Sequence, residues 1–78
     1  MSTELTWNDC CMAVCNAAYG KTSGNICYAA GYAQAGRRMH SDRERGVQAL
    51  YILNNIQHWR GDEAKAVRAR LKEFAANA

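Results

Sequence analysis

Four cysteines and two histidines are the residues of this 78-residue chain best suited to chemistry. Cys11 and Cys15 stand four residues apart, so a helix would place both on one face. A third thiolate and a histidine could then complete a tetrahedral zinc site. The spacing matches no zinc finger, because the chain has neither a Cys-x-x-Cys pair nor closely spaced histidines. Buried thiols also act as small hydrophobic side chains. We therefore predict reduced, metal-free cysteines packed in a core: Cys10, Cys11, Cys15 and Cys27.

Catalytic motifs are missing from the sequence. It contains no nucleophile elbow of the G-x-S-x-G type, no phosphate-binding loop and no pair of carboxylates with an evident cleft. Cys27 and His58 could form a nucleophile and its base, but nothing in the sequence directs one toward the other. A chain of this size also has little volume for a typical ligand pocket of at least ~300 Å³. We predict a protein that is not an enzyme and needs no cofactor.

Basic residues gather in two places, and each allows two interpretations. Residues 37–45 could bind a phosphate or an acidic partner through four guanidinium groups. Alternatively, the arginines and the acids between them complement the dipoles of two helix ends. The partner-binding candidates here are Arg37, Arg38, Arg43 and Arg45.

The second basic group lies near the C-terminus and suggests a helix-turn-helix protein whose last helix contacts DNA. Asp62 and Glu63 oppose this, because the start of a recognition helix meets the DNA and these carboxylates repel phosphates. DNA binding stays the alternative function, with four candidate contacts: Lys65, Arg68, Arg70 and Lys72.

Periodicity and end signals predict four helices, at about residues 6–19, 25–39, 41–59 and 63–76. Thr6 is a good N-cap and Gly20 a stop signal, and residues 21–24 are typical of a loop. Ser41 and Glu44 match the S-x-x-E capping box, and Asp62 can cap the last helix. We expect an all-α fold, a small bundle of three to four short helices in one domain, residues 1–78.

Two helix faces carry specific expectations. A stripe of small side chains in the second helix (Cys27, Gly31, Ala35) predicts that a neighbouring helix packs closely there. The third helix is apolar on two sides, which predicts burial of both. One side consists of Ala49, Ile52, Leu53, Ile56 and Trp59. The other consists of Val47, Leu50 and Tyr51, and a chain this small has little protein left to cover it. We therefore expect that side to form a symmetric dimer or to bind a partner.

Composition limits the classes of protein to which this chain can belong. Ten Lys and Arg against seven Asp and Glu give a formal charge of +3, and 14 of the residues are alanine. Leu, Ile, Val and Phe together number only 11, so the core is small. These figures exclude a multi-domain enzyme, an all-β sandwich and a membrane span. The first residues are polar rather than typical of a secretory signal, so we expect a cytoplasmic protein.

Two segments, residues 47–61 with 63–68 and residues 27–33, resemble small uncharacterised helical proteins encoded by temperate phages and prophages. The resemblance implies an inhibitor of the anti-CRISPR or anti-defence type that disables a host protein or ribonucleoprotein complex in the bacterial cytoplasm. Because Arg and Tyr dominate binding hot spots, the expected contacts are the arginines of residues 37–45 together with Tyr28, Tyr32 and Tyr51. A small DNA-binding regulator is the alternative that the resemblance also allows.

Overall fold

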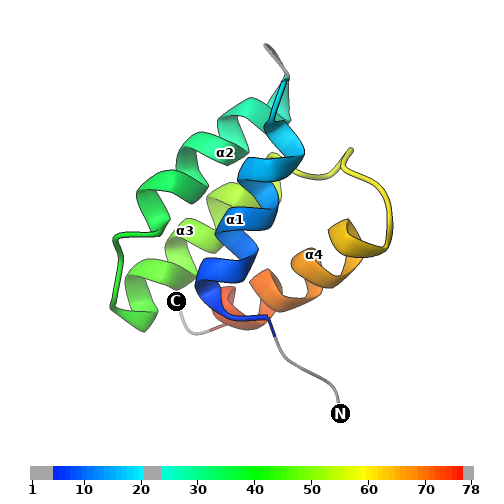
Figure 1. Cartoon of the computed structure of the whole chain (residues 1–78). Coiled ribbons are helices and arrows are strands. Elements are labelled where there is room, and N and C mark those ends of the chain that lie inside the picture. The colour runs from blue at the N-terminus through cyan, green and yellow to red at the C-terminus, as the bar shows by residue number, and fades with distance from the viewer. Residues whose placement is uncertain (1–4, 21–23, 77–78) are drawn as a thin grey trace.

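The computed structural model describes residues 5–20 and 24–76, which form four helices and no strand. The helices are α1 (Trp7–Ala18), α2 (Asn25–Gly36), α3 (Asp42–Asn54) and α4 (Asp62–Ala75) (Figure 1). The prediction of a small all-α bundle is therefore confirmed. Most of the expected loop at residues 21–24 lies outside the described residues. None of the described helices is both long and apolar enough to cross a bilayer.

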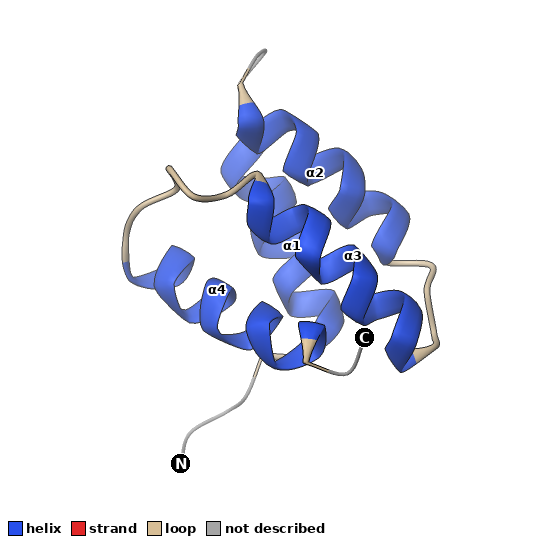
Figure 2. Ribbon diagram, turned by 180° about the vertical axis from the view of Figure 1, so that it is seen from behind, coloured by secondary structure: helices blue, strands red, loops and turns tan. Residues whose placement is uncertain are grey.

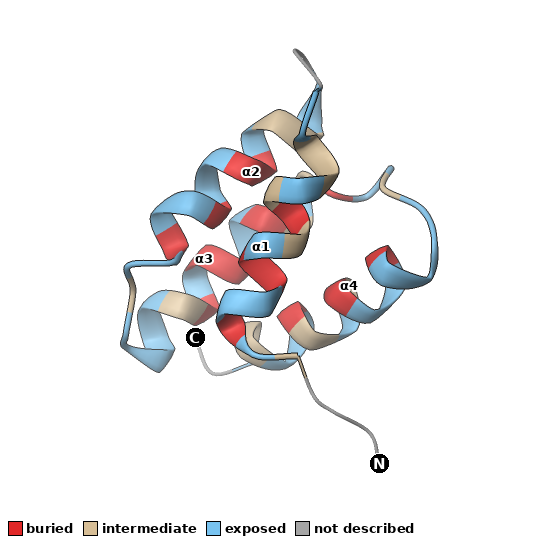
Figure 3. Ribbon diagram, in the orientation of Figure 1, coloured by how far each residue is buried: buried red, intermediate tan, exposed pale blue. Residues whose placement is uncertain are grey.

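Each helix packs against the next one along the chain, and α1 also contacts α4. Seen from behind, α2 and α3 lie together on one side of the molecule while α4 crosses the other (Figure 2). The resulting body measures 31 × 28 × 18 Å. This arrangement leaves the outer sides of α2 and α3 without a covering element, as the exposed bands in Figure 3 indicate.

The core is made of small and medium side chains contributed by every helix. Trp7 is its largest member, and the Trp7 ring meets the ring of Phe74 edge to face, with centroids 5.1 Å apart. The apolar side of the third helix is buried as expected at Ala49, Ile52 and Ile56. The other buried members of this cluster are Cys10, Cys11, Val14, Ala29, Ala33, Val67 and Leu71.

Close packing in α2 occurs at Gly36, not along the predicted stripe. The indole Nε1 of Trp7 donates a hydrogen bond of 2.7 Å to the backbone oxygen of Gly36. A Cβ at Gly36 would lie 2.9 Å from a ring carbon of Trp7, so only glycine fits there. By contrast, Gly31 and Ala35 are exposed. The prediction of a close contact along Cys27, Gly31 and Ala35 is wrong, because α2 buries Ala29, Ala30, Ala33 and Gly36 instead.

The helix starts only partly follow the sequence signals. Thr6 forms a full capping box with Asp9, each side chain accepting a 3.0 Å hydrogen bond from the other's backbone N–H. Ser41 occupies the N-cap of α3, but its side chain makes no capping hydrogen bond within the described structure. The predicted capping box of Ser41 and Glu44 is therefore wrong. In α4, Asp62 is the first helical residue, and Gly61 (φ +112°) takes the cap position that we assigned to Asp62.

Helices α2 and α3 end earlier than their apolar patterns predict, at Gly36 and Asn54. Ile56 stays buried and Trp59 half-buried in the turns after α3, so the pattern continues beyond the helix. Arg68 of α4 stabilises these turns, because its guanidinium donates to the backbone oxygens of Ile56 (3.2 Å) and Trp59 (2.5 Å). Apolar spacing alone could not distinguish these buried turns from another turn of helix.

Candidate binding surface

Large apolar side chains are exposed mainly on α2 and α3. Five of them have between 39% and 66% of their surface accessible, whereas most apolar residues of the other faces are buried. We call this surface the tyrosine face, and define it by the exposed residues of two helix stripes. The α2 stripe is Tyr28, Gly31, Tyr32 and Ala35, and the α3 stripe is Val47, Leu50, Tyr51 and Asn54.

The two stripes join into one continuous surface. In each helix the members are spaced i, i+3, i+4 and i+7, which places them on one side of that helix. The rings of Tyr32 and Tyr51 stack across the helix boundary with centroids 5.4 Å apart and planes 24° from parallel. Beneath them, the Gln48 side-chain amide donates a 2.7 Å hydrogen bond to the backbone oxygen of Tyr32. These contacts hold α2 and α3 in a fixed register.

No charged residue belongs to the tyrosine face. Residues 24–36 and 46–59 contain no Asp, Glu, Lys or Arg, although the chain has 17 of them. The solvent side of a helix normally carries charged residues. Depletion of charge with enrichment of tyrosine is instead typical of the centre of a protein interface. The face therefore has the composition of an interface that this single chain leaves uncovered.

The sequence analysis identified the apolar members of this face without showing that they meet. It placed Val47, Leu50 and Tyr51 on one side of the third helix, and the structure leaves all three exposed. It named Tyr28 and Tyr32 as aromatic contacts of the second helix but did not place that helix beside the third, where Tyr32 stacks on Tyr51. It missed Gly31 and Ala35 as surface members. The two charge-free segments were the signal that could have revealed the whole face.

The four arginines of residues 37–45 divide into two kinds. Arg45 serves the fold, because its Nε donates to the backbone oxygen of Met39 (2.9 Å) and its guanidinium lies 6.0 Å from the centre of the Trp7 ring. Arg37 is exposed and donates to the side-chain oxygen of Asn8 at 3.3 Å. Arg38 and Arg43 are exposed, and their side chains make no hydrogen bond or ion pair with other described residues. We call Arg37, Arg38 and Arg43 the arginine corner.

The arginine corner lies where α2 ends and α3 begins. Arg43 precedes Val47 by one helical turn, so the corner borders one end of the tyrosine face. A polar hollow of about 450 Å³ lies beside it, lined by Asn8, Gln34, Arg37 and Arg38. The corner can therefore present guanidinium groups to an acidic surface.

The basic residues of α4 are also of two kinds. Lys65 and Lys72 are exposed. Arg68 is half-buried and occupied by the backbone oxygens described above. Arg70 donates to the backbone oxygen of Leu5 (2.6 Å) and lies over the Phe74 ring at 4.5 Å. Two of the four candidate DNA contacts thus hold parts of the fold together.

Cys10 and Cys11 are fully buried thiols. Burial raises the pKa of Cys10 to about 11, with Arg70 acting in the opposite direction. Burial, and then the neighbouring Cys10 and Cys15 thiols, raise the pKa of Cys11 to about 12. Both therefore stay protonated at neutral pH. The Cys15 thiol contacts the backbone oxygen of Ala30 at 3.8 Å. Among the described residues, no three His, Cys, Asp or Glu side chains come close enough to form a metal site.

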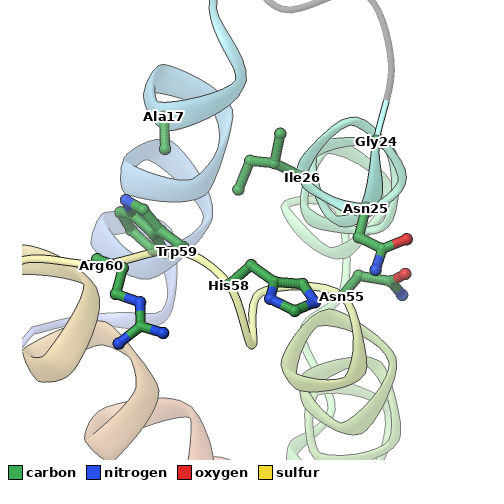
Figure 4. Close-up of a pocket in the computed structure, with 8 residues that line it drawn as sticks. All are labelled: Ala17, Gly24, Asn25, Ile26, Asn55, His58, Trp59 and Arg60. Carbon is green, nitrogen blue, oxygen red and sulfur yellow. The ribbon is translucent and has the colours of Figure 1, made fainter.

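A pocket of about 490 Å³ lies between the end of α1, the start of α2 and the turns after α3, so the expectation that the chain has too little volume for a pocket is wrong. The His58 ring lies beside the amides of Asn25 and Asn55, while Trp59 and Arg60 form the opposite wall (Figure 4). The lining includes neither a thiol nor a carboxylate, so Cys27 is not part of it. The pocket offers amide and imidazole groups, but no nucleophile next to a base.

Fold and surface together define a small helical protein whose most distinctive feature is an uncharged aromatic face. No protein family, curated protein or solved structure matches this chain.

Proposed function

We propose that this chain is a non-catalytic binding protein that inhibits a larger host assembly by covering part of its surface, as small phage inhibitors do. The observation that carries the proposal is the arginine corner, where Arg37, Arg38 and Arg43 are exposed beside a polar hollow. Arginine is one of the residue types enriched at binding hot spots. The phage-type assignment itself rests on the sequence resemblance.

The partner should offer an acidic surface. The side chains of Arg38 and Arg43 make no hydrogen bond or ion pair with other described residues, so both guanidinium groups are available for carboxylates or phosphates. Arginine binds such groups through two parallel hydrogen bonds, which gives both affinity and orientation. The net charge of +3 favours encounter with an acidic partner in the same way.

The buried thiols support a role without catalysis. A nucleophilic cysteine needs a lowered pKa and access to substrate, whereas Cys10 and Cys11 are buried with raised pKa values. The histidine in the pocket has no thiol or carboxylate beside it in the lining. Binding therefore explains the described residues better than covalent or acid–base chemistry does.

DNA binding is the competing function, and two geometric facts weaken it. Residues 55–61 separate α3 from α4, and this connection is longer than the three- to four-residue turn of a helix-turn-helix. Arg68 and Arg70 are engaged by backbone oxygens, so α4 has fewer guanidinium groups for phosphates. Lys65 and Lys72 stay exposed and are the residues on which this alternative depends.

Affinity capture from a bacterial lysate, followed by binding measurements with the recovered partner, tests the proposal. The informative variant is Arg38→Glu with Arg43→Glu, and its control is Lys65→Glu with Lys72→Glu, which changes the net charge by the same amount. We expect the corner variant to lose at least about tenfold in affinity, since reversed charges would face an acidic surface. The control variant should bind like the original chain.

The opposite pattern would overturn the proposal. If the α4 variant lost the partner and the corner variant kept it, the arginine corner would not be the contact. Recovery of duplex DNA alone, with no protein partner, would support the regulator instead.

A further inference from the structure

We propose that a second copy of this chain covers the tyrosine face, forming a twofold symmetric dimer that leaves both arginine corners open. The inference goes beyond the proposed function and does not depend on it. It concerns the central apolar part of the surface, whereas partner binding requires the charged corner.

Charge is the first argument for a second copy as the occupant. In a twofold interface the same patch lies on both sides, so a patch with charge of a single sign would repel its copy. The tyrosine face has no charge to repel an identical face. A face built for an acidic partner would instead carry the arginines at its centre, but they lie at its end.

Shape is the second argument. Tyr28 and Leu50 project from the face, with 66% and 47% of their surfaces accessible. Gly31 is also exposed and leaves the α2 stripe low at its own position, because no described atom lies within 4 Å of the place where a Cβ would stand. A twofold axis that lies in the plane of the interface and crosses the helices halfway along the α2 stripe can set Tyr28 of one copy against Ala35 of the other. The face thus carries both halves of a self-complementary contact.

Area is the third argument. The exposed fractions of Tyr28, Tyr32, Val47, Leu50 and Tyr51 correspond to roughly 500 Å² of accessible surface. Gly31, Ala35 and Asn54 extend the patch toward the ~800 Å² per partner that a standard stable interface buries. A chain of 78 residues with an alanine-rich core also gains more from added burial than a large domain does.

The same geometry keeps the positive corners apart. Each corner lies at one end of α2 and α3, so a twofold axis that lies in the interface and runs across the helices sends the two corners to opposite ends. A helix of the length of α3, 13 residues, spans about 20 Å, beyond the ~8 Å screening length of physiological salt. The dimer would therefore present two separated binding corners.

Sedimentation equilibrium of the full chain tests the inference across micromolar to millimolar concentrations. We expect the mass of a dimer, and a thermal midpoint that rises with concentration. Tyr28→Glu and Gly31→Glu should each weaken the dimer at least about tenfold, because a carboxylate would be buried without a partner. Both sites are exposed and helical, so the single chain should still fold, which circular dichroism checks. Ala69→Glu, at an exposed site of α4, adds the same charge and should change nothing.

A monomer at all concentrations would overturn the inference, as would a dimer that tolerates both Tyr28→Glu and Gly31→Glu. Failure here is distinguishable from failure of the proposed function. The corner variant, Arg38→Glu with Arg43→Glu, should keep the dimer while losing the partner. A monomeric chain that still binds its partner through the corner would refute only the dimer.

Discussion

Gly36 lies where the indole ring of Trp7 reaches across to the end of α2. The backbone oxygen of Gly36 accepts the indole hydrogen bond, and the Gln48 side chain packs against the same position from α3. Three helices therefore meet at a residue that contributes no side chain. Gly31, five residues earlier, lies in the same helix but on the solvent side.

Substituting each glycine with alanine should produce opposite effects on the free energy of unfolding. In Gly36→Ala the new Cβ would lie 2.9 Å from Trp7 and 3.2 Å from Gln48, and such overpacking costs about 1–3 kcal/mol. In Gly31→Ala nothing obstructs the methyl group, and better helix propensity should add about 0.5–1 kcal/mol. Urea unfolding at low protein concentration measures both values free of any dimer. Equal effects of the two substitutions would contradict the close contact at Gly36.

The sequence could not distinguish these two glycines. Both interrupt an alanine-rich helix, and both invite the interpretation that another backbone approaches closely. Which one is buried depends on the rotation of α2 about its axis, and Trp7, 29 residues away from Gly36, determines that rotation. The same rotation places Tyr28 and Tyr32 on the surface, so it also decided the composition of the tyrosine face.

At the scale of the helices, local signals and tertiary contacts contribute unequally. The four helices and their approximate bounds could be predicted, because alanine content and apolar spacing agree over most of each segment. The end of α3 could not, because Ile56 and Trp59 keep the helical spacing while their backbone oxygens bind Arg68. The end of α3 is therefore determined by Arg68 of α4, and the local sequence pattern of α3 gives no information about that contact.

Capping gives a matched test at this scale. Thr6 and Ser41 are hydroxyl residues at the N-caps of α1 and α3, yet only Thr6 makes a side-chain capping hydrogen bond within the described structure. Thr6→Ala should lower the free energy of unfolding by about 1 kcal/mol, since it exposes an unpaired backbone N–H of the first turn. Ser41→Ala should change it by less than about 0.5 kcal/mol. Equilibrium denaturation of both variants measures these changes. An equal loss of stability in Thr6→Ala and Ser41→Ala would contradict the difference in capping hydrogen bonds between the two residues.

For the whole molecule, the distribution of charge matters more than its sum. The 17 charged residues avoid the tyrosine face, and three of the arginines turn inward to bind backbone oxygens, namely Arg45, Arg68 and Arg70. The molecule therefore has an uncharged side and a scattered basic remainder rather than one continuous basic stripe. Continuous stripes are the footprint of nucleic-acid-binding domains.

This distribution predicts a weak response of DNA binding to salt. If α4 contacted duplex DNA, Lys65 and Lys72 would supply its phosphate contacts, because Arg68 and Arg70 are held by the chain itself. The logarithm of the association constant should then fall with the logarithm of salt concentration with a slope no steeper than about −2. Fluorescence anisotropy with a labelled duplex between about 50 and 200 mM salt measures this slope. Lys65→Glu with Lys72→Glu should abolish what binding there is, while leaving capture of a protein partner unchanged.

A slope of about −6 or steeper would mean that many more phosphates are contacted than the exposed lysines can reach. The inward arginines would then have to leave their backbone oxygens, and DNA binding would replace partner inhibition as the function.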